Sequence, residues 1–277
     1  MDLKNKVCII TGATSGIGRE TAKMLAANGA KLVFPIRDSL KGDLLKDEIL
    51  QEVSEAKLDF MHCNLASFQS IRDFVKEFKS KYDSLHLLIN NAGIWETKRN
   101  VSEDGIEMNF AVNHLAPFLL TNLLLDVLKK SAPARVINVS SEAHRTGKIN
   151  FADPESEKGY SSFKSYSQSK LANILFTKKL SQTLKGTGVT ANCLHPGMVN
   201  TNLFEKMPSI MYNIMKPFMI TPRQGAQTSV FLATSDDGGA KSGEYFVKSK
   251  PKKPATIALR QDVADKLWEM SEKYTGL

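Results

Sequence analysis

Short runs of apolar, β-branched residues alternate along this chain with longer segments in which apolar residues recur every three or four positions. The apolar runs predict strands near residues 6–11, 31–36, 57–63, 86–90, 134–141 and 188–195, and a shorter one near 243–248. The periodic segments predict helices near residues 16–29, 39–55, 67–82, 105–130 and 160–186. Because strands that are apolar along their whole length and alternate with helices form parallel sheets, we predict an α/β protein with a doubly wound parallel sheet.

The 277 residues are close to the upper limit for one core, and no Gly/Ser-rich or Pro-rich spacer divides them, so we expect a single domain over residues 1–277. No apolar run is long enough to span a bilayer, and the first predicted strand starts near the N-terminus. We therefore expect a cytoplasmic protein without a signal peptide or transmembrane segment. Cys8, Cys63 and Cys193 lie in or beside strand-like runs without metal-ligand spacing, which predicts buried reduced thiols and no metal site.

The formal net charge of +8 does not by itself indicate a nucleic-acid partner. Basic residues are dispersed and interleaved with Asp and Glu, which is typical of a solvated surface, so we expect no nucleic-acid binding. The exception is the basic segment 248–254, which contains two prolines. We interpret it as a soluble loop, with weak peripheral contact to acidic lipids or phosphates as the alternative.

Three closely spaced glycines, Gly12, Gly16 and Gly18, follow the first predicted strand, and a helix begins among them. Glycines let the backbone approach a pyrophosphate, and a helix N-terminus offers N–H groups and a positive dipole end. The spacing is G-x-x-x-G-x-G and not the better-known G-x-G-x-x-G. The motif predicts a dinucleotide site, with a purely structural turn as the alternative.

Polar residues and glycines also follow the other predicted strands. Ligands of doubly wound sheets bind beyond the carboxyl ends of the strands, so these residues are candidates for one site. They are Arg37-Asp38, Asn64-Leu65, Asn90 to Gly93, Ser140-Ser141 and His195-Pro196-Gly197.

Tyr166 and Lys170 stand four residues apart at the start of a predicted helix, so their side chains share one face. A nearby ammonium stabilises phenolate, and we expect Lys170 to lower the pKa of Tyr166 into the range of a useful acid or base. Tyr160 and Lys164 have the same spacing. Because Tyr166 continues into an apolar helical pattern and Tyr160 lies in a Gly/Ser/Lys-rich connection that we interpret as flexible, we favour Tyr166.

In these motifs the chain resembles the short-chain dehydrogenase/reductase family over essentially its full length. The matching stretches are Thr11 to Gly18, Asn90 to Gly93, Asn113, Ser140-Ser141, Tyr166 to Lys170, and Pro196-Gly197 with Thr201. Residues 112–121 and 166–176 are most similar to the retinol dehydrogenase and carbonyl reductase branch. The resemblance implies a three-layer Rossmann fold and an oxidoreductase that interconverts a carbonyl and an alcohol.

The resemblance also implies a catalytic tetrad of Asn113, Ser141, Tyr166 and Lys170. Tyr166 would exchange a proton with the substrate oxygen, Lys170 would hold the nicotinamide ribose, and Asn113 would keep a water in a relay to Lys170. Asn113 as a helix-interior or capping residue is the alternative. Adjacent strand residues point to opposite faces, so only one serine of the pair reaches the substrate; the family pattern favours Ser141, with Ser140 as the alternative.

The cofactor-binding residues that the resemblance implies are Gly12, Thr14, Ser15, Gly16, Ile17, Gly18, Arg37, Asn64, Leu65, Asn91, Ala92, Gly93, Tyr166, Lys170, Pro196, Gly197, Val199 and Thr201. Asn64 departs from this branch, which usually has Asp facing the adenine, although an amide oxygen accepts the same hydrogen bond. At the second strand end, Asp38 would favour NAD and Arg37 would favour NADP through its 2′-phosphate. We predict NADP(H), because Arg suits phosphate geometry and a basic residue here goes with NADP in the family.

Methionine and aliphatic residues recur at helical spacing between Leu203 and Ile220. We predict a substrate lid within residues 202–222, with a core helix or a dimer contact as the alternative. The lid favours a small apolar carbonyl or alcohol, retinoid-like or lipid-derived, as substrate. A C=C (enone) reductase and a cofactor-binding redox-sensing scaffold are the alternative functions. Relatives dimerise through the helices equivalent to 105–130 and 160–186, so a homo-oligomer is compatible with the sequence.

Overall fold

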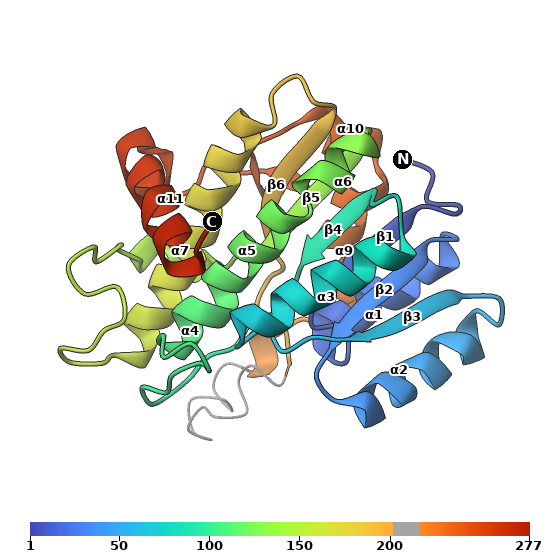
Figure 1. Ribbon diagram of the computed structural model, residues 1–277, viewed down its shortest axis with the longest axis horizontal. Helices are drawn as coiled ribbons and strands as arrows, with labels where there is room; N and C mark the ends of the chain where they lie inside the picture. The colour runs from blue at the N-terminus through green and yellow to red at the C-terminus, as the bar shows by residue number, and fades with distance from the viewer. Residues whose placement is uncertain (202–215) are drawn as a thin grey trace.

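The computed structural model describes residues 1–201 and 216–277, which build one eight-stranded sheet with helices on both faces (Figure 1). Its strand order is β3-β2-β1-β4-β5-β6-β7-β8, and every neighbouring pair is parallel except β7 and β8. The strands are β1 (Val7–Ile10), β2 (Lys31–Ile36), β3 (Lys57–His62), β4 (Leu87–Asn90), β5 (Ala134–Val139), β6 (Val189–His195), β7 (Tyr245–Val247) and β8 (Lys250–Pro251). The predicted doubly wound α/β fold is confirmed, and its strand order reverses between β1 and β4, where such sheets bind ligands.

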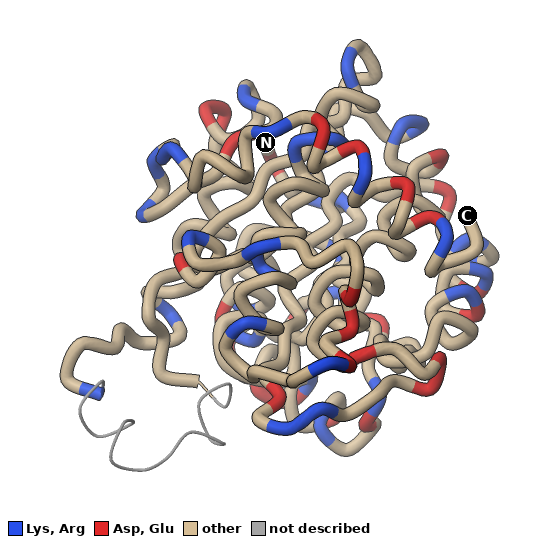
Figure 2. Tube along the Cα trace, turned by 90° about the vertical axis from the view of Figure 1, so that its left-hand side faces the viewer, with Lys and Arg blue, Asp and Glu red and all other residues tan. Residues whose placement is uncertain are grey.

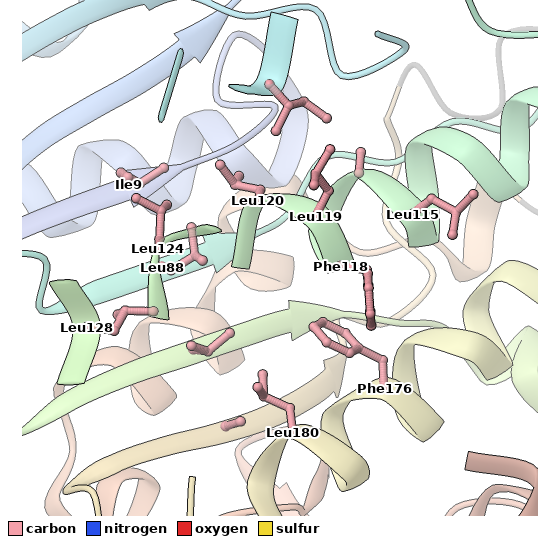
Figure 3. Close-up of a cluster of buried hydrophobic side chains, with 14 of the residues drawn as sticks. Ile9, Leu88, Leu115, Phe118, Leu119, Leu120, Leu124, Leu128, Phe176 and Leu180 are labelled. Atoms are coloured by element: carbon pink, nitrogen blue, oxygen red, sulfur yellow. The ribbon is translucent and has the colours of Figure 1, made fainter. Parts of the chain in front are cut away.

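Alternating side chains of the strands build two separate cores, one on each face of the sheet. On β1, Ile9 packs into one core while Cys8 and Ile10 pack into the other. The first core is covered by α3 (Phe68–Lys81), α5 (Ala116–Leu123), α6 (Leu125–Lys130), α7 (Ser162–Thr183) and α11 (Gln261–Thr275); Figure 3 shows part of it. The second core is covered by α1 (Gly16–Ala27), α2 (Ser39–Glu52) and α9 (Pro222–Thr234).

The single helix predicted over residues 105–130 is wrong in detail, because the segment is divided into four pieces. They are α4 (Met108–Phe110), a π-helix (Ala111–Leu115), α5 and α6. The apolar pattern continues through all four, so periodicity alone does not reveal the breaks. Asn113 lies inside the π-helix, an irregularity that is frequent at functional sites.

Several elements were not predicted from the sequence. They are α9, α10 (Asp236–Ala240), α11, β8 and the 3₁₀ turns Glu142–Thr146, Lys216–Phe218 and Thr256–Leu259. The basic segment 248–254 is therefore not a plain loop, since it contains β8, which pairs with the preceding strand β7. The helix predicted over residues 160–186 begins at Ser162, and Tyr160 lies outside it.

The C-terminal helix α11 packs on α7 (Figure 1) and also contacts the π-helix Ala111–Leu115. Trp268 of α11 contacts Phe118 and Phe176, with ring centroids 4.9 and 5.9 Å apart. His114 Nε2 and Ser271 Oγ are 2.9 Å apart in the same interface. Helix α11 thus covers apolar surface of α5 and α7, which lie in the two segments expected to make subunit contacts.

Basic and acidic residues are interspersed over the surface of the described chain (Figure 2). None of the helices in residues 1–201 and 216–277 is both long and apolar enough to cross a membrane. Cys8, Cys63 and Cys193 are free and buried, as predicted.

Candidate active site

The glycine turn after β1 packs so closely on the chain after β4 that larger residues would not fit. Gly12 has a φ of +65°, and a Cβ here would lie 2.8 Å from Ala92 Cα. A Cβ on Gly18 would collide with the carbonyl oxygen of Gly12. Asn91 Nδ2 donates to the carbonyl oxygens of Thr11 and Gly12 at 2.9 and 3.1 Å. The turn forms a glycine cradle, and the first residues of α1, whose N–H groups have no partner within the helix, follow directly after it.

A pocket of about 790 Å³ extends along the carboxyl ends of six neighbouring strands, from β3 across the sheet to β6. Every cofactor-binding residue predicted from the sequence lines it, and so do Ser141, Tyr166 and Lys170. Asn113 is fully buried in contact with the chain that forms the pocket wall. The fold therefore brings the predicted site residues from all six strand ends to one place.

Tyr166 and Lys170 project from α7 into this pocket, and both are buried. Lys170 Nζ donates to the carbonyl oxygen of Val139 at 3.3 Å and lies 5.5 Å from the centroid of the Tyr166 ring. Burial lowers the pKa of Lys170 to about 8 and raises the pKa of Tyr166 to about 12. The expected lowering of the tyrosine pKa is wrong for this structure, because the loss of phenolate solvation dominates.

The two candidate serines have different environments. Ser140 Oγ is buried and donates to the carbonyl oxygen of Lys170 at 2.7 Å, which is a structural contact. Both serines line the pocket, but it is Ser141 that hydrogen-bonds with Tyr166, and this bond opposes the rise in the tyrosine pKa. This geometry favours Ser141 as the serine beside the reacting oxygen.

Asn113 clamps the backbone that follows the β4 strand end. Its Oδ1 accepts from Ile94 N at 2.8 Å, and its Nδ2 donates to Ile94 O at 2.9 Å and to Ser169 Oγ at 3.0 Å. A Cβ on Gly93 would lie 3.1 Å from Lys170 Nζ and 3.5 Å from Asn113 Oδ1, so Gly93 is what lets the chain pass between them. The observed role of Asn113 is positional, and its relay role stays a prediction.

The end of β2 carries the residues that bear on cofactor choice. Asp38 is the N-cap of α2: its carboxylate accepts from Lys41 N at 3.2 Å and lies 3.9 Å from Lys41 Nζ. Arg37 and Lys41 both line the pocket. The Asp38 carboxylate at this strand end is thus already hydrogen-bonded to the first turn of the helix that follows it.

Asn64, just after the end of β3, is fixed by hydrogen bonds of its side chain and its backbone. Its Nδ2 donates to Glu103 Oε1 at 2.7 Å, its Oδ1 accepts from Ala66 N at 3.1 Å, and its N donates to Ser70 Oγ at 2.8 Å. The amide oxygen keeps one acceptor position, so the predicted adenine contact stays compatible with the structure.

Several pocket residues were missed by sequence reasoning. Trp95, Met108 and Val112 form apolar wall, and no local motif signals that they face the site. His195 was noted at its strand end without a role. Its Nδ1 accepts from Glu142 N at 3.4 Å, and burial lowers its pKa to about 4, so the ring is neutral at neutral pH.

The predicted lid falls mainly on residues 202–215, which lie outside the described residues. Of its described end, Ile220 forms a bridge with Val199 at the pocket wall, and Phe218 is largely exposed. Thr221 begins α9 through a capping box with Gln224. The lid stays a prediction.

A doubly wound sheet that gathers a glycine cradle, a buried Tyr–Lys pair and a serine at one pocket defines a nicotinamide-dependent oxidoreductase. The chain belongs to the short chain dehydrogenase family, whose sequence profile matches residues 6–210. It is 42% identical to retinol dehydrogenase 14 of Mus musculus over 99% of this chain and 87% of that protein. It is also 42% identical to retinol dehydrogenase 12 of Homo sapiens, over 100% of this chain and 88% of that one. A crystal structure from Mycobacterium paratuberculosis, 31% identical, matches with a TM-score of 0.81 and covers 99% of this chain and 96% of its own.

Proposed function

We propose that this protein is an NADP(H)-dependent oxidoreductase that interconverts a carbonyl and an alcohol on an apolar substrate. The observation that carries the proposal is the convergence of Tyr166, Ser141 and Lys170 on the pocket that the glycine cradle also lines. A dinucleotide fits this cradle, because Gly12 and Gly18 let the turn close tightly and the start of α1, with its free N–H groups, lines the pocket. When bound, the nicotinamide supplies or accepts the hydride.

Tyr166 is the proton donor in the reductive direction. With a pKa of about 12 its hydroxyl is protonated at neutral pH and can give a proton to the developing alkoxide oxygen. Ser141 donates a second hydrogen bond to that oxygen. Lys170 places a positive charge beside Tyr166 and Ser141. Asn113 fixes the backbone of Ile94, which lines the same pocket.

Arg37 and Lys41 support NADP(H) over NAD(H). A 2′-phosphate at the end of β2 would meet two cations, since Asp38 is engaged as the cap of α2 and partly neutralised by Lys41. Guanidinium groups suit phosphate oxygens, whereas an uncharged ribose hydroxyl would gain little from either cation.

The apolar substrate is supported by Trp95, whose ring contacts Tyr166, by Met108 and Val112 on the pocket wall, and by the names of the relatives. We infer a hydrophobic aldehyde, ketone or alcohol, with retinoid-like compounds as the first to try.

The test measures binding of NADPH and NADH together with NADPH consumption on a panel of apolar aldehydes and ketones. Arg37→Leu should weaken NADPH binding by about 10- to 100-fold, the range for a charge-assisted hydrogen bond, and leave NADH binding nearly unchanged. The matched control is Lys46→Leu, an exposed α2 residue away from the pocket. An equal loss for both cofactors would contradict the assignment to NADP(H).

A further inference from the structure

The loop that leaves β4 carries Trp95 between two peptide units that are both fixed by side chains. On one side, the N–H and the carbonyl of Ile94 are both hydrogen-bonded to the amide of Asn113, at 2.8 and 2.9 Å. Asn113 is itself fully buried in the π-helix and held by Ser169. The backbone entering Trp95 therefore has little freedom to move.

On the other side, the backbone of Glu96 is fixed in the same way. Its N–H donates to Asn109 Oδ1 at 2.9 Å, and its carbonyl accepts from Tyr160 Oη at 2.8 Å and from Ser162 Oγ at 2.7 Å. The expected flexible connection around Tyr160 is thus wrong, because its hydroxyl anchors this loop. The π-helix, α4, Tyr160 and α7 thus hold a short loop from which the aromatic side chain of Trp95 lines the pocket.

The indole of Trp95 lies against the proposed proton donor. Its ring centroid is 5.5 Å from that of Tyr166, with 30° between the planes, and 6.5 Å from that of Phe163. Met108 and Val112 also line the pocket. A rigid aromatic surface beside the ring of the proposed proton donor favours flat π systems, because offset stacking gains more than contact with a puckered ring of the same size.

We propose that Trp95 is a specificity-determining residue: its fixed indole forms the wall against which the part of the substrate next to the carbonyl lies. This wall selects carbonyls conjugated to an aryl ring or a double bond over saturated carbonyls of equal carbon number. The inference rests on the proposed carbonyl–alcohol chemistry for its kinetic test, and a separate binding test does not need that chemistry.

The kinetic test compares benzaldehyde with cyclohexanecarbaldehyde, which have the same carbon skeleton and differ in planarity. Trp95→Leu should lower kcat/KM for benzaldehyde by about 3- to 10-fold more than for cyclohexanecarbaldehyde, the scale of an aromatic pair. Trp95→Phe should restore most of the preference. Equal losses for both aldehydes would show that Trp95 only positions Tyr166 and would overturn the proposal.

The binding test uses Trp268→Phe, which leaves Trp95 as the single tryptophan of a chain that has two. A thermal melt checks that this variant is folded; otherwise the difference between the parent and Trp95→Phe gives the same signal. 4-Nitrobenzyl alcohol, which quenches a contacting indole, should quench Trp95 saturably, and benzyl alcohol should compete better than cyclohexylmethanol.

The two tests distinguish a failure of the aromatic wall from a failure of the proposed function. Saturable, selectively competed quenching without turnover of either aldehyde would overturn the proposed function and leave the aromatic wall standing. Turnover without aldehyde preference and without saturable quenching would overturn the wall and leave the proposed function standing.

Discussion

Replacing Lys170 by Met should stabilise the fold at neutral pH while abolishing turnover. Lys170 is fully buried, and its pKa falls from the ordinary 10.5 to about 8. At 1.36 kcal/mol per pKa unit, holding the charged form in the folded chain costs roughly 3 kcal/mol at pH 7. An apolar side chain of similar length removes this cost, apart from the loss of the bond to Val139 O.

The pH dependence of this difference is its clearest signature. A group whose folded pKa is below its unfolded pKa binds fewer protons when folded, so the parent gains stability as pH rises from about 8 towards 10.5. The advantage of Lys170→Met in unfolding free energy should therefore shrink by about 2 kcal/mol between about pH 7 and pH 9.5. Denaturant titrations at several pH values measure it, with Lys164→Met, an exposed lysine of the same helix, as control. A difference that is independent of pH would refute the reasoning.

The remaining predictions concern the serine pair and the pH profile. Ser141→Ala should lower kcat by about 10- to 100-fold with little change in melting temperature. Ser140→Ala should cost about 1 kcal/mol of stability, through the lost bond to Lys170 O, and leave kcat unchanged. Kinetics and thermal melts of both variants check this, and the reverse pattern would exchange the roles of the two serines. The kcat for carbonyl reduction should fall as pH rises through about 8, where Lys170 loses its charge while Tyr166, with a pKa of about 12, stays protonated. A flat profile to pH 10 would show that this charge does not assist the reaction.

The sheet and its order of elements were predictable because each strand is buried on both faces and so reads as a continuous apolar run. The π-helix around Asn113 was not, since the apolar spacing is the same on both sides of it. Helix α9 did carry a sequence signal, the capping box of Thr221 and Gln224 beside Pro222, but the segment before it had been interpreted as a lid up to residue 222.

The site residues were predictable where backbone geometry demands a residue type, as at Gly12 and Gly18. The environment of a side chain was harder to predict. Sequence spacing places Lys170 beside Tyr166, but only the structure shows that both are so deeply buried that desolvation dominates their pKa values. Trp95 faces the pocket because tertiary hydrogen bonds fix the loop around it, and no local pattern encodes those partners.

The measurement that tests the central claim most directly is the turnover of Tyr166→Phe beside Tyr160→Phe on one apolar aldehyde with NADPH. Tyr166→Phe should lower kcat by at least ~100-fold, the scale for losing a positioned acid, and leave NADPH affinity nearly intact. Tyr160→Phe removes the hydroxyl that bonds Glu96 O and Asn109, so it should lower stability and keep most of the kcat. A Tyr166→Phe variant with near-parental kcat, or a loss confined to Tyr160→Phe, would contradict the account.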